Sequence, residues 1–383
     1  MGIAERRLIH GSQVPDRIDQ VLRPSRCREQ PEPGQNPEDQ GAARQAWHGR
    51  AVPAYTGEPE EIEIGVMAPS YRGGSDLSDD AMNFPDRQTP TGDEVFFDHV
   101  AWMTADMDRA SAAFERLGFV LTPYSEHGNR DPETGERQVQ GSANRLAMLE
   151  RGYIELLCAV PGTDTPVSRN IADNLARYEG VHLVACTVSD ADADYARLQR
   201  QGTPLYPMVH LRRDVEAADG SDAEVAFSVV RPEFGAFPEG RMQVLTHHTP
   251  DHMWQDRYIA RENGLTGLAQ VLFCVEDPAA SAARLSALTR TPWRTDGEDA
   301  VIDLTRGRMR FTTEAGLDRL IPGAVAPSLP FVAALGFRSR DVAASRAFFA
   351  DRGVTMMGRS DGADGGFAIG AQDGLGCYLM ISD

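Results

Sequence analysis

The chain has 383 residues and an acidic balance, with 38 basic and 57 acidic side chains and a net charge of −19. This charge repels phosphate backbones and anionic membrane surfaces, so we expect neither a nucleic acid nor a membrane as a partner. All basic residues are arginine. The absence of lysine excludes Schiff-base and phosphate-loop chemistry, which both need a lysine amine.

The five cysteines are odd in number and include no C-x-x-C pair, which predicts free thiols rather than a disulfide framework. No apolar stretch resembles a secretory signal or a membrane span of about 18 residues. These features predict a cytoplasmic location.

Residues 1–93 differ in composition from the rest of the chain. Pro, Gln, Gly, Glu and Arg dominate much of the stretch, and large apolar residues are few. Such a sequence buries too little apolar surface to offset the entropy of ordering. We expect a disordered extension, or alternatively an arm that packs on the core or on a second subunit.

A structured pattern begins after residue 93. An apolar strand is followed by Asp106, which can cap a helix, and Gly118 can end that helix. Turn residues then separate further apolar runs. The expected elements are a strand over 98–103, a helix over 107–117, a strand over 119–121, a polar loop over 126–141, and strands over 144–149 and 153–160.

The same β-α-β-β-β plan recurs in the units that begin at Val181, Leu268 and Phe331. Recurrence in a fixed order is the strongest organisational signal in the chain. Residues 249–267 contain proline and glycine and separate the second unit from the third. We therefore predict an α+β protein with four βαβββ modules, paired into one domain over 94–254 and another over 265–383. The second pair can cap the first or carry a homodimer interface.

Aligning the modules compares equivalent positions on their first and last strands. The first-strand position, seven residues before the acidic cap, holds His99, Gln270 and Ala334 in modules one, three and four. In module two, His182 lies seven or eight residues before the candidate caps Ser189 and Asp190. The last-strand position, counted from a preceding glycine, holds Glu155, Gln243, Arg310 and Leu379.

Modules one and two thus offer His99, Glu155, His182 and Gln243 as metal ligands. Two imidazoles and one carboxylate suit Fe, Mn, Co, Ni or Zn as divalent ions, and Gln243 can add a weaker oxygen ligand. Each histidine alone could instead be a hydrogen-bonded core residue. Glu155 in a dry core would need a partner or solvent.

Further candidates surround the same cup. His247 shares a strand face with Gln243 and could act as an acid, a base or an extra ligand, or serve the turn between the domains. Asn144 or Arg145 should face the cup, and Arg145 could bind a substrate carboxylate. Cys186 is predicted to form a small part of the pocket wall. His127 lies in the polar loop, which could be a lid or a surface loop.

The repeated unit, with His on its first strand and Glu on its last, resembles the vicinal oxygen chelate superfamily, and within it the glyoxalase-like domain proteins. The motifs that carry the resemblance are Phe97-Asp98-His99-Val100, Gly141-Ser142-Ala143-Asn144, Gly152-Tyr153-Ile154-Glu155-Leu156 and His247-His248-Thr249-Pro250-Asp251-His252-Met253-Trp254. The resemblance implies two paired-module domains of the glyoxalase/bleomycin-resistance type. It also implies a metal inside a cup of two curled sheets, and a substrate that chelates this metal through adjacent oxygens.

Three functions follow from the resemblance. The first is a metal-dependent lyase or isomerase for a small oxygenated substrate, with Glu155 or His247 moving a proton. The second is an extradiol-type ring-cleaving dioxygenase, and the third is a small-molecule binding protein without turnover. Gln243 stands where glyoxalase I has a second glutamate, and an amide cannot act as a base.

Overall fold

The computed structural model describes residues 86–130, 137–360 and 365–383. The predicted extension over 1–93 lies almost wholly outside the described residues. Within them, no helix is long and apolar enough to cross a membrane. The described cysteines are free and buried: Cys158, Cys186, Cys274 and Cys377.

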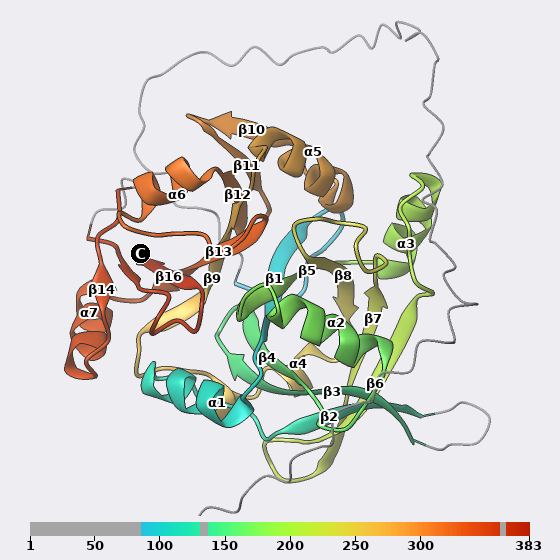
Figure 1. The fold of residues 1–383 in the computed structure, drawn as a ribbon. Helices are drawn as coiled ribbons and strands as arrows, with labels where there is room; N and C mark the ends of the chain where they lie inside the picture. Colours follow the sequence, from blue (N-terminus) through green and yellow to red (C-terminus); the bar gives the residue numbers. More distant parts are fainter. Residues whose placement is uncertain (1–85, 131–136, 361–364) are drawn as a thin grey trace, which may run out of the picture. The chain divides into compact units, whose positions relative to one another are not determined.

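The structure confirms the α+β class and the four βαβββ modules (Figure 1). Module one contains β1 (Val95–Met103), α1 (Met107–Arg116), β2 (Ser125–Arg130), β3 (Arg137–Met148) and β4 (Tyr153–Ala159). Module two contains β5 (Gly180–Val188), α3 (Ala191–Arg200), β6 (Val209–Glu216), β7 (Asp222–Val230) and β8 (Arg241–His247). Module three contains β9 (Leu265–Cys274), α5 (Pro278–Thr289), β10 (Trp293–Asp296), β11 (Asp299–Asp303) and β12 (Arg308–Thr312). Module four contains β13 (Phe331–Ser339), α7 (Val342–Asp351), β14 (Met356–Met357), β15 (Phe367–Ile369) and β16 (Tyr378–Ser382).

Each pair of modules forms one eight-stranded sheet. The first has the order β2-β3-β4-β1-β5-β8-β7-β6, and the second has the order β10-β11-β12-β9-β13-β16-β15-β14. The first strands of the two modules, β1 and β5, run antiparallel at the centre, and each also pairs in parallel with the last strand of its own module. The centre of each sheet therefore juxtaposes the two strand types that carry the predicted site residues.

The helix that follows each first strand begins in the same way. An aspartate carboxylate accepts a hydrogen bond from the backbone N–H three residues later, which satisfies one of the free donors of the first turn. The four caps are Asp106, Asp190, Asp277 and Asp341. They mark the start of each of these helices, two or three residues after the first strand ends.

The second strand of module one differs from the prediction. Residues 119–121 make only an isolated bridge, Leu121 with Ala147, whereas the strand β2 forms within the predicted loop, at Ser125–Arg130. The short apolar run Phe119–Leu121 is instead used for packing, since Phe119 and Leu121 are buried in the main core. His127 consequently lies on a strand of the sheet.

Side chains of both sheets build the largest hydrophobic cluster. Phe97 and Trp102 of β1 belong to it together with Phe273 of β9 and Phe337 of β13. The Trp102 indole N–H also donates to the Leu375 carbonyl at 3.1 Å. The segments predicted as separate domains thus share buried apolar surface.

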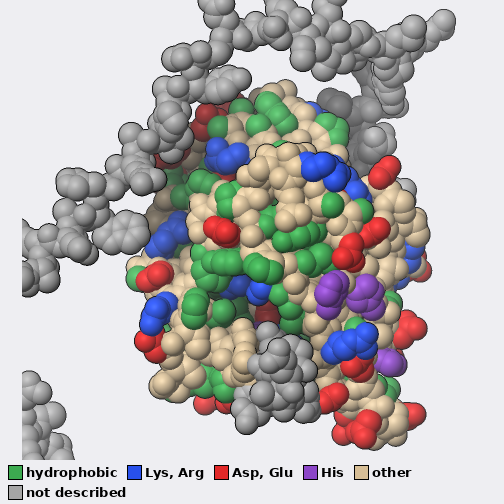
Figure 2. All heavy atoms as spheres, turned by 90° about the vertical axis from the view of Figure 1, so that its right-hand side faces the viewer, with side chains coloured by type: hydrophobic (Ala, Val, Ile, Leu, Met, Phe, Trp, Pro, Cys, Tyr) green, Lys and Arg blue, Asp and Glu red, His purple; other side chains and the backbone are tan. Residues whose placement is uncertain are grey.

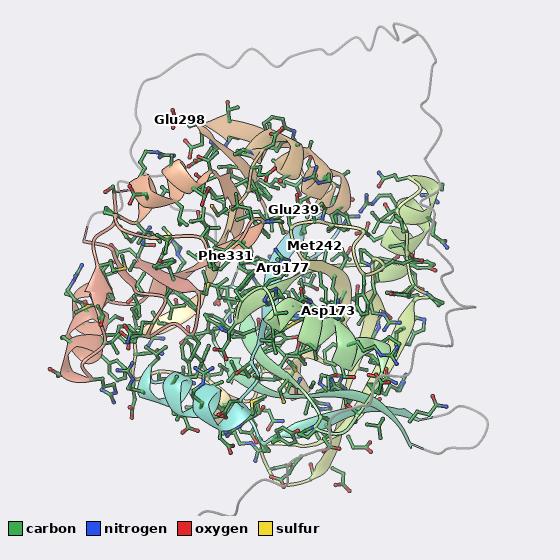
Figure 3. All side chains as sticks on the ribbon, in the orientation of Figure 1. Asp173, Arg177, Glu239, Met242, Glu298 and Phe331 are labelled. Carbon is green, nitrogen blue, oxygen red and sulfur yellow. The ribbon has the colours of Figure 1, made fainter. Side chains whose placement is uncertain are left out.

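Each sheet has a second face, turned away from the shared cluster, and different elements cover this face in the two sheets. The face of the second sheet packs on α6 (Glu314–Leu320) through Leu317 and Leu320. On the first sheet, α2 (Pro166–Leu175) covers one part through Ile171. After α2 the chain meets β13 near Arg177 and Phe331 (Figure 3). Arg177 donates to the Pro330 carbonyl, and Tyr178 contacts Phe331 edge-on, with ring centroids 4.8 Å apart. The remaining part of the first face is open.

Candidate functional site

A β-bulge in β1 brings two polar side chains together. Phe97 pairs with Cys186 and His99 with Ala185, so Asp98 is an extra residue in β1. Such an insertion breaks the alternation of side chains between the two faces. Asp98 is fully buried and its Oδ2 atom accepts a hydrogen bond from His99 Nδ1 at 2.7 Å.

The same bulge occurs in the other three modules. The extra residue is His182 in β5, Ala269 in β9 and Ala333 in β13. The position after each bulge, seven residues before the helix cap, holds His99, Leu183, Gln270 and Ala334. Leu183 is thus the counterpart of His99, and the placement of His182 in that position was wrong by one residue.

His182 points away from the predicted site. Its Nε2–H donates to the Tyr178 carbonyl at 2.8 Å, and its ring stacks on Tyr178 with centroids 3.9 Å apart. Burial lowers the pKa of His182 to about 4, so the ring is neutral near pH 7. These contacts make His182 a packing residue between β5 and the segment after α2.

The open part of the first sheet contains a cavity of about 520 Å³. Its lining includes four of the predicted site residues, namely His99, Asn144, Glu155 and Gln243. Apolar side chains such as Leu183, Leu211 and Phe227 form much of the wall. Figure 2 shows a hollow on one side of the molecule that is bordered by hydrophobic side chains and has charged side chains in its depth.

His99 is held in one tautomer and orientation. Its Nδ1–H donates to Asp98, which leaves Nε2 as the nitrogen that can accept a proton. Its ring stacks on Tyr153 with centroids 4.4 Å apart. Burial raises the pKa of Asp98, but His247 and His99 outweigh this effect and hold it well below its usual range. Asp98 is therefore a carboxylate.

Glu155 lies beside His99 on the adjacent strand β4. Its Oε1 atom accepts a hydrogen bond from Asn144 Nδ2 at 2.6 Å and lies 3.7 Å from His127 Nε2. Burial raises the pKa of Glu155, but His127, His99, Asn144 and Arg213 together lower it below the usual value. Glu155 is therefore ionised at neutral pH.

His127 enters the site from β2. Its Nδ1 atom is 2.9 Å from the Ser142 hydroxyl. Burial and the positive charge of Arg213 lower its pKa to about 4, so the ring is neutral. Since the hydroxyl can be donor or acceptor, the tautomer of His127 is not fixed by this contact.

Two arginines in the cavity were missed in the sequence analysis. Arg213 of β6 and Arg241 of β8 both line it. Burial lowers the pKa of Arg213, and it lowers that of Arg241 to about 10. A signal was present for Arg213: it shares a strand face with Val209, Leu211 and Val215, where an arginine is out of place in an apolar pattern.

Three other predicted residues lie outside the cavity lining. Arg145 donates to the Thr122 carbonyl at 2.9 Å, and Cys186 belongs to the core between the sheets. Burial raises the pKa of the Cys186 thiol, so the thiol stays protonated and is not a nucleophile. His247 is buried behind His99, where its Nε2–H donates to Asp98 at 3.0 Å.

The predicted metal ligands do not assemble. Leu183 puts a hydrocarbon side chain where the second imidazole was expected, so His99, Glu155 and Gln243 remain. Among the described residues, no group of three or more His, Cys, Asp and Glu side chains is arranged to hold a metal ion. Arg213 and Arg241 also interact electrostatically with Glu155, and their positive charge opposes the binding of a cation there. The donor set does not fit the metal that the resemblance implies.

The site chemistry that remains is proton transfer and charge stabilisation. His99 Nε2 is a base whose conjugate acid the Asp98 carboxylate would stabilise. Glu155 can accept a hydrogen bond from a substrate hydroxyl. Arg213 and Arg241 can stabilise an oxyanion in a setting partly shielded from water.

Comparisons with known proteins agree with this fold. The sequence matches the family described as a glyoxalase-like domain over residues 97–289. No curated protein is matched by the sequence. Among solved structures, the fold is similar to that of a hypothetical protein from Staphylococcus aureus, with a TM-score of 0.52, 12% identity and coverage of 75% of this chain and 99% of the other.

Two further structures have named activities. A mutant of 4-hydroxymandelate synthase from Streptomyces coelicolor aligns with a TM-score of 0.47 and 16% identity, over 75% of this chain and 92% of the other. A methylmalonyl-CoA epimerase aligns with a TM-score of 0.26 and 20% identity, over 40% of this chain and 95% of the other.

Proposed function

Since the chain belongs to the glyoxalase-like domain family of the vicinal oxygen chelate superfamily, we propose that it is a lyase or isomerase that moves a proton on a small oxygenated substrate. The substrate lies in the cavity of the first sheet. The observation that carries the proposal is the buried Asp98–His99 pair, whose histidine lines that cavity. A carboxylate that fixes the tautomer of a histidine is the usual support of a general base.

The other cavity residues suit the remaining requirements of such a reaction. Removing a proton next to a carbonyl develops negative charge on oxygen, which Arg213 and Arg241 can stabilise. Glu155, held by Asn144, can orient a substrate hydroxyl. Because Glu155 is ionised, it cannot be the acid that protonates the substrate.

Metal dependence has no part in this mechanism, because the donor set does not fit. The dioxygenase is not favoured, because among the described residues no group of three His, Cys, Asp or Glu side chains is arranged to hold the metal that would activate O₂. A cytoplasmic location and a homodimer stay predictions, and size-exclusion chromatography tests the second.

Hydrogen exchange at carbon tests the proposed function. A panel of small 2-hydroxy and 2-oxo acids and α-hydroxyketones is incubated with the protein in D₂O, and deuterium incorporation is followed by NMR. We expect exchange with at least one compound and a loss of roughly 10²- to 10⁴-fold in His99→Asn, the range for removal of a general base.

His99→Asn is the matched variant because its amide N–H can still donate to Asp98 while Nε2 is absent. Arg145→Gln, which changes a side chain outside the cavity, is the control and should exchange at the wild-type rate. Equal exchange by wild type and His99→Asn would contradict His99 as the base. No exchange with any compound would favour the binding-protein function.

A further inference from the structure

The cavity of the first sheet holds two arginines that no side chain in the described part of the chain neutralises by direct contact. Among the described residues, the side chains of Arg213 and Arg241 form no hydrogen bond or ion pair, and Arg241 Nη1 is buried without a partner. The Arg241 guanidinium has an aromatic contact, 5.1 Å from the Phe234 ring centroid. Burying such a group without a partner is costly, because it loses its hydration.

In the second sheet, a partly buried arginine is neutralised by aspartates of the same chain. Arg310 occupies in β12 the position that Glu155 occupies in β4, and Asp299 accepts its Nη1–H at 2.8 Å. Asp296 accepts a second hydrogen bond from it. The arginine of the second sheet is thus neutralised within the chain, whereas Arg213 and Arg241 have no such partner among the residues that the structure describes.

Among the described residues that line the first cavity, arginines outnumber carboxylates. Arg213 and Arg241 both interact electrostatically with Glu155, so a single carboxylate faces two guanidinium groups. His127 is neutral at pH 7 because its pKa is about 4.

The charged residues at the rim do not remove the excess. Arg257 pairs with Glu216 at 2.9 Å, Asp214 has a partner, and Arg231 adds a further guanidinium. A bound anion would supply the missing charge and the missing acceptors.

We infer that the positive charge of Arg213 and Arg241 makes this cavity an anion site, and that the cavity takes a small monocarboxylate with an apolar body. Guanidinium groups match the planar oxygens of a carboxylate. The apolar body would lie against the wall formed by Leu211, Phe227 and Leu245. The inference rests on the proposed function for the view that this cavity is the substrate site, but anion binding can be measured without turnover.

Calorimetric titration with three probes tests the subsite in the full-length protein. Hexanoate carries the carboxylate and an apolar chain, hexanamide is its neutral counterpart, and inorganic phosphate is an anion without the chain. We expect hexanoate to bind at least tenfold tighter than either of the others. Arg213→Met and Arg241→Met should each weaken hexanoate at least tenfold and leave hexanamide unchanged, and Arg145→Met is the matched control.

A thermal-unfolding measurement keeps the test valid if binding is weak. Without ligand, Arg213→Met and Arg241→Met should unfold at or above the wild-type temperature, because each removes an unpartnered buried charge. Hexanoate should raise the unfolding temperature of the wild type and of Arg145→Met, but not that of the two cavity variants.

Several results would overturn the inference. Equal affinity for hexanoate and hexanamide would show that charge is not recognised, and full hexanoate affinity in the cavity variants would place the subsite elsewhere. Tighter binding of phosphate than of hexanoate would overturn the carboxylate class. Hexanoate binding that persists in His99→Asn, together with no exchange activity in the wild type, would reject the proposed function while the subsite stands.

Discussion

Asp98 and His247 are 149 residues apart in sequence, yet the His247 Nε2–H donates to the Asp98 carboxylate at 3.0 Å. The same carboxylate accepts the Nδ1–H of His99 at 2.7 Å. Trp254 and Phe227 pack edge-on against the His247 ring, at 4.9 and 5.1 Å between centroids. A single buried carboxylate thus joins the cavity histidine to the end of β8.

This arrangement predicts the effect of Asp98→Asn. An amide can donate its own N–H to His99 Nδ1, which would move the ring proton to Nε2 and remove the base. We expect the exchange rate at saturation to fall about 10²- to 10⁴-fold, with little change in the substrate concentration for half-maximal rate.

The tautomer of His99 can be read directly from its ¹⁵N chemical shifts. Wild type should show the proton on Nδ1, and Asp98→Asn should show it on Nε2. His247→Gln, which keeps an N–H donor for Asp98, should retain the wild-type tautomer. If Asp98→Asn keeps both the tautomer and the rate, Asp98 does not position His99.

The register of β5 predicts how the metal content responds to substitution. His182 lies outside the cavity, so His182→Ala should leave the metal content of the purified protein unchanged. Leu183→His would place an imidazole in the counterpart position of His99, and so add the missing donor to the predicted set of His99, Glu155 and Gln243. We expect zinc or iron to be retained in Leu183→His above the wild-type level, as measured by elemental analysis. Metal that is present in wild type and lost in His182→Ala would refute the register argument.

The module plan was accessible from the sequence because strand and helix periodicities recur in a fixed order. The error at His182 arose from one extra residue, since a bulge shifts the alternation without leaving a mark in composition. The cap Asp190 was the usable signal: counting seven residues back from it gives Leu183, just as counting from Asp106 gives His99. The alternative cap Ser189 gave the wrong residue.

The charges of the cavity were harder to foresee. Arg213 belongs to the edge strand β6, and only the curvature of the sheet brings it within electrostatic reach of Glu155 on β4. Long-range curvature of this kind is set by packing and is not encoded in a local pattern. Glu155 and Gln243 were predicted because each stands at a fixed distance after a glycine that directly precedes its strand, and Asn144 was one of two neighbouring candidates on β3.

Stability should fall between pH 7.5 and 5, where buried histidines bind fewer protons in the folded chain than in the unfolded one. The pKa of His127 is lowered from 6.5 to about 4, and that of His182 likewise. Below pH 6.5 the unfolded chain takes up these protons first, so each histidine costs about 2 kcal/mol of unfolding free energy by pH 5. Because the pKa of Glu155 is lowered in the folded chain, its protonation reduces the unfolding free energy only below about pH 4.5, the pKa of this group in the unfolded chain.

Urea unfolding at pH 7.5 and pH 5 checks this window. His127→Gln should reduce the difference between the two pH values by about 2 kcal/mol, because the side chain can no longer be protonated. Val120→Thr, an exposed substitution, should leave the difference unchanged. An undiminished difference in His127→Gln would mean that His127 is not held neutral by burial.

The two sheets should unfold together because one hydrophobic cluster contains side chains of both. Trp254 follows the first sheet and Trp293 lies in β10 of the second, so variants that keep one of these tryptophans report on one sheet each. We expect the same denaturant midpoint for both probes.

Phe273→Ala removes a fully buried ring that stacks on Phe311 with ring centroids 5.0 Å apart, and it should lower the unfolding free energy by about 3–5 kcal/mol at both probes. Val325→Ala, at a side chain that is 72% exposed, should change neither midpoint. A loss confined to the Trp293 probe would instead make the sheets independent folding units, since the shared core would then not couple them.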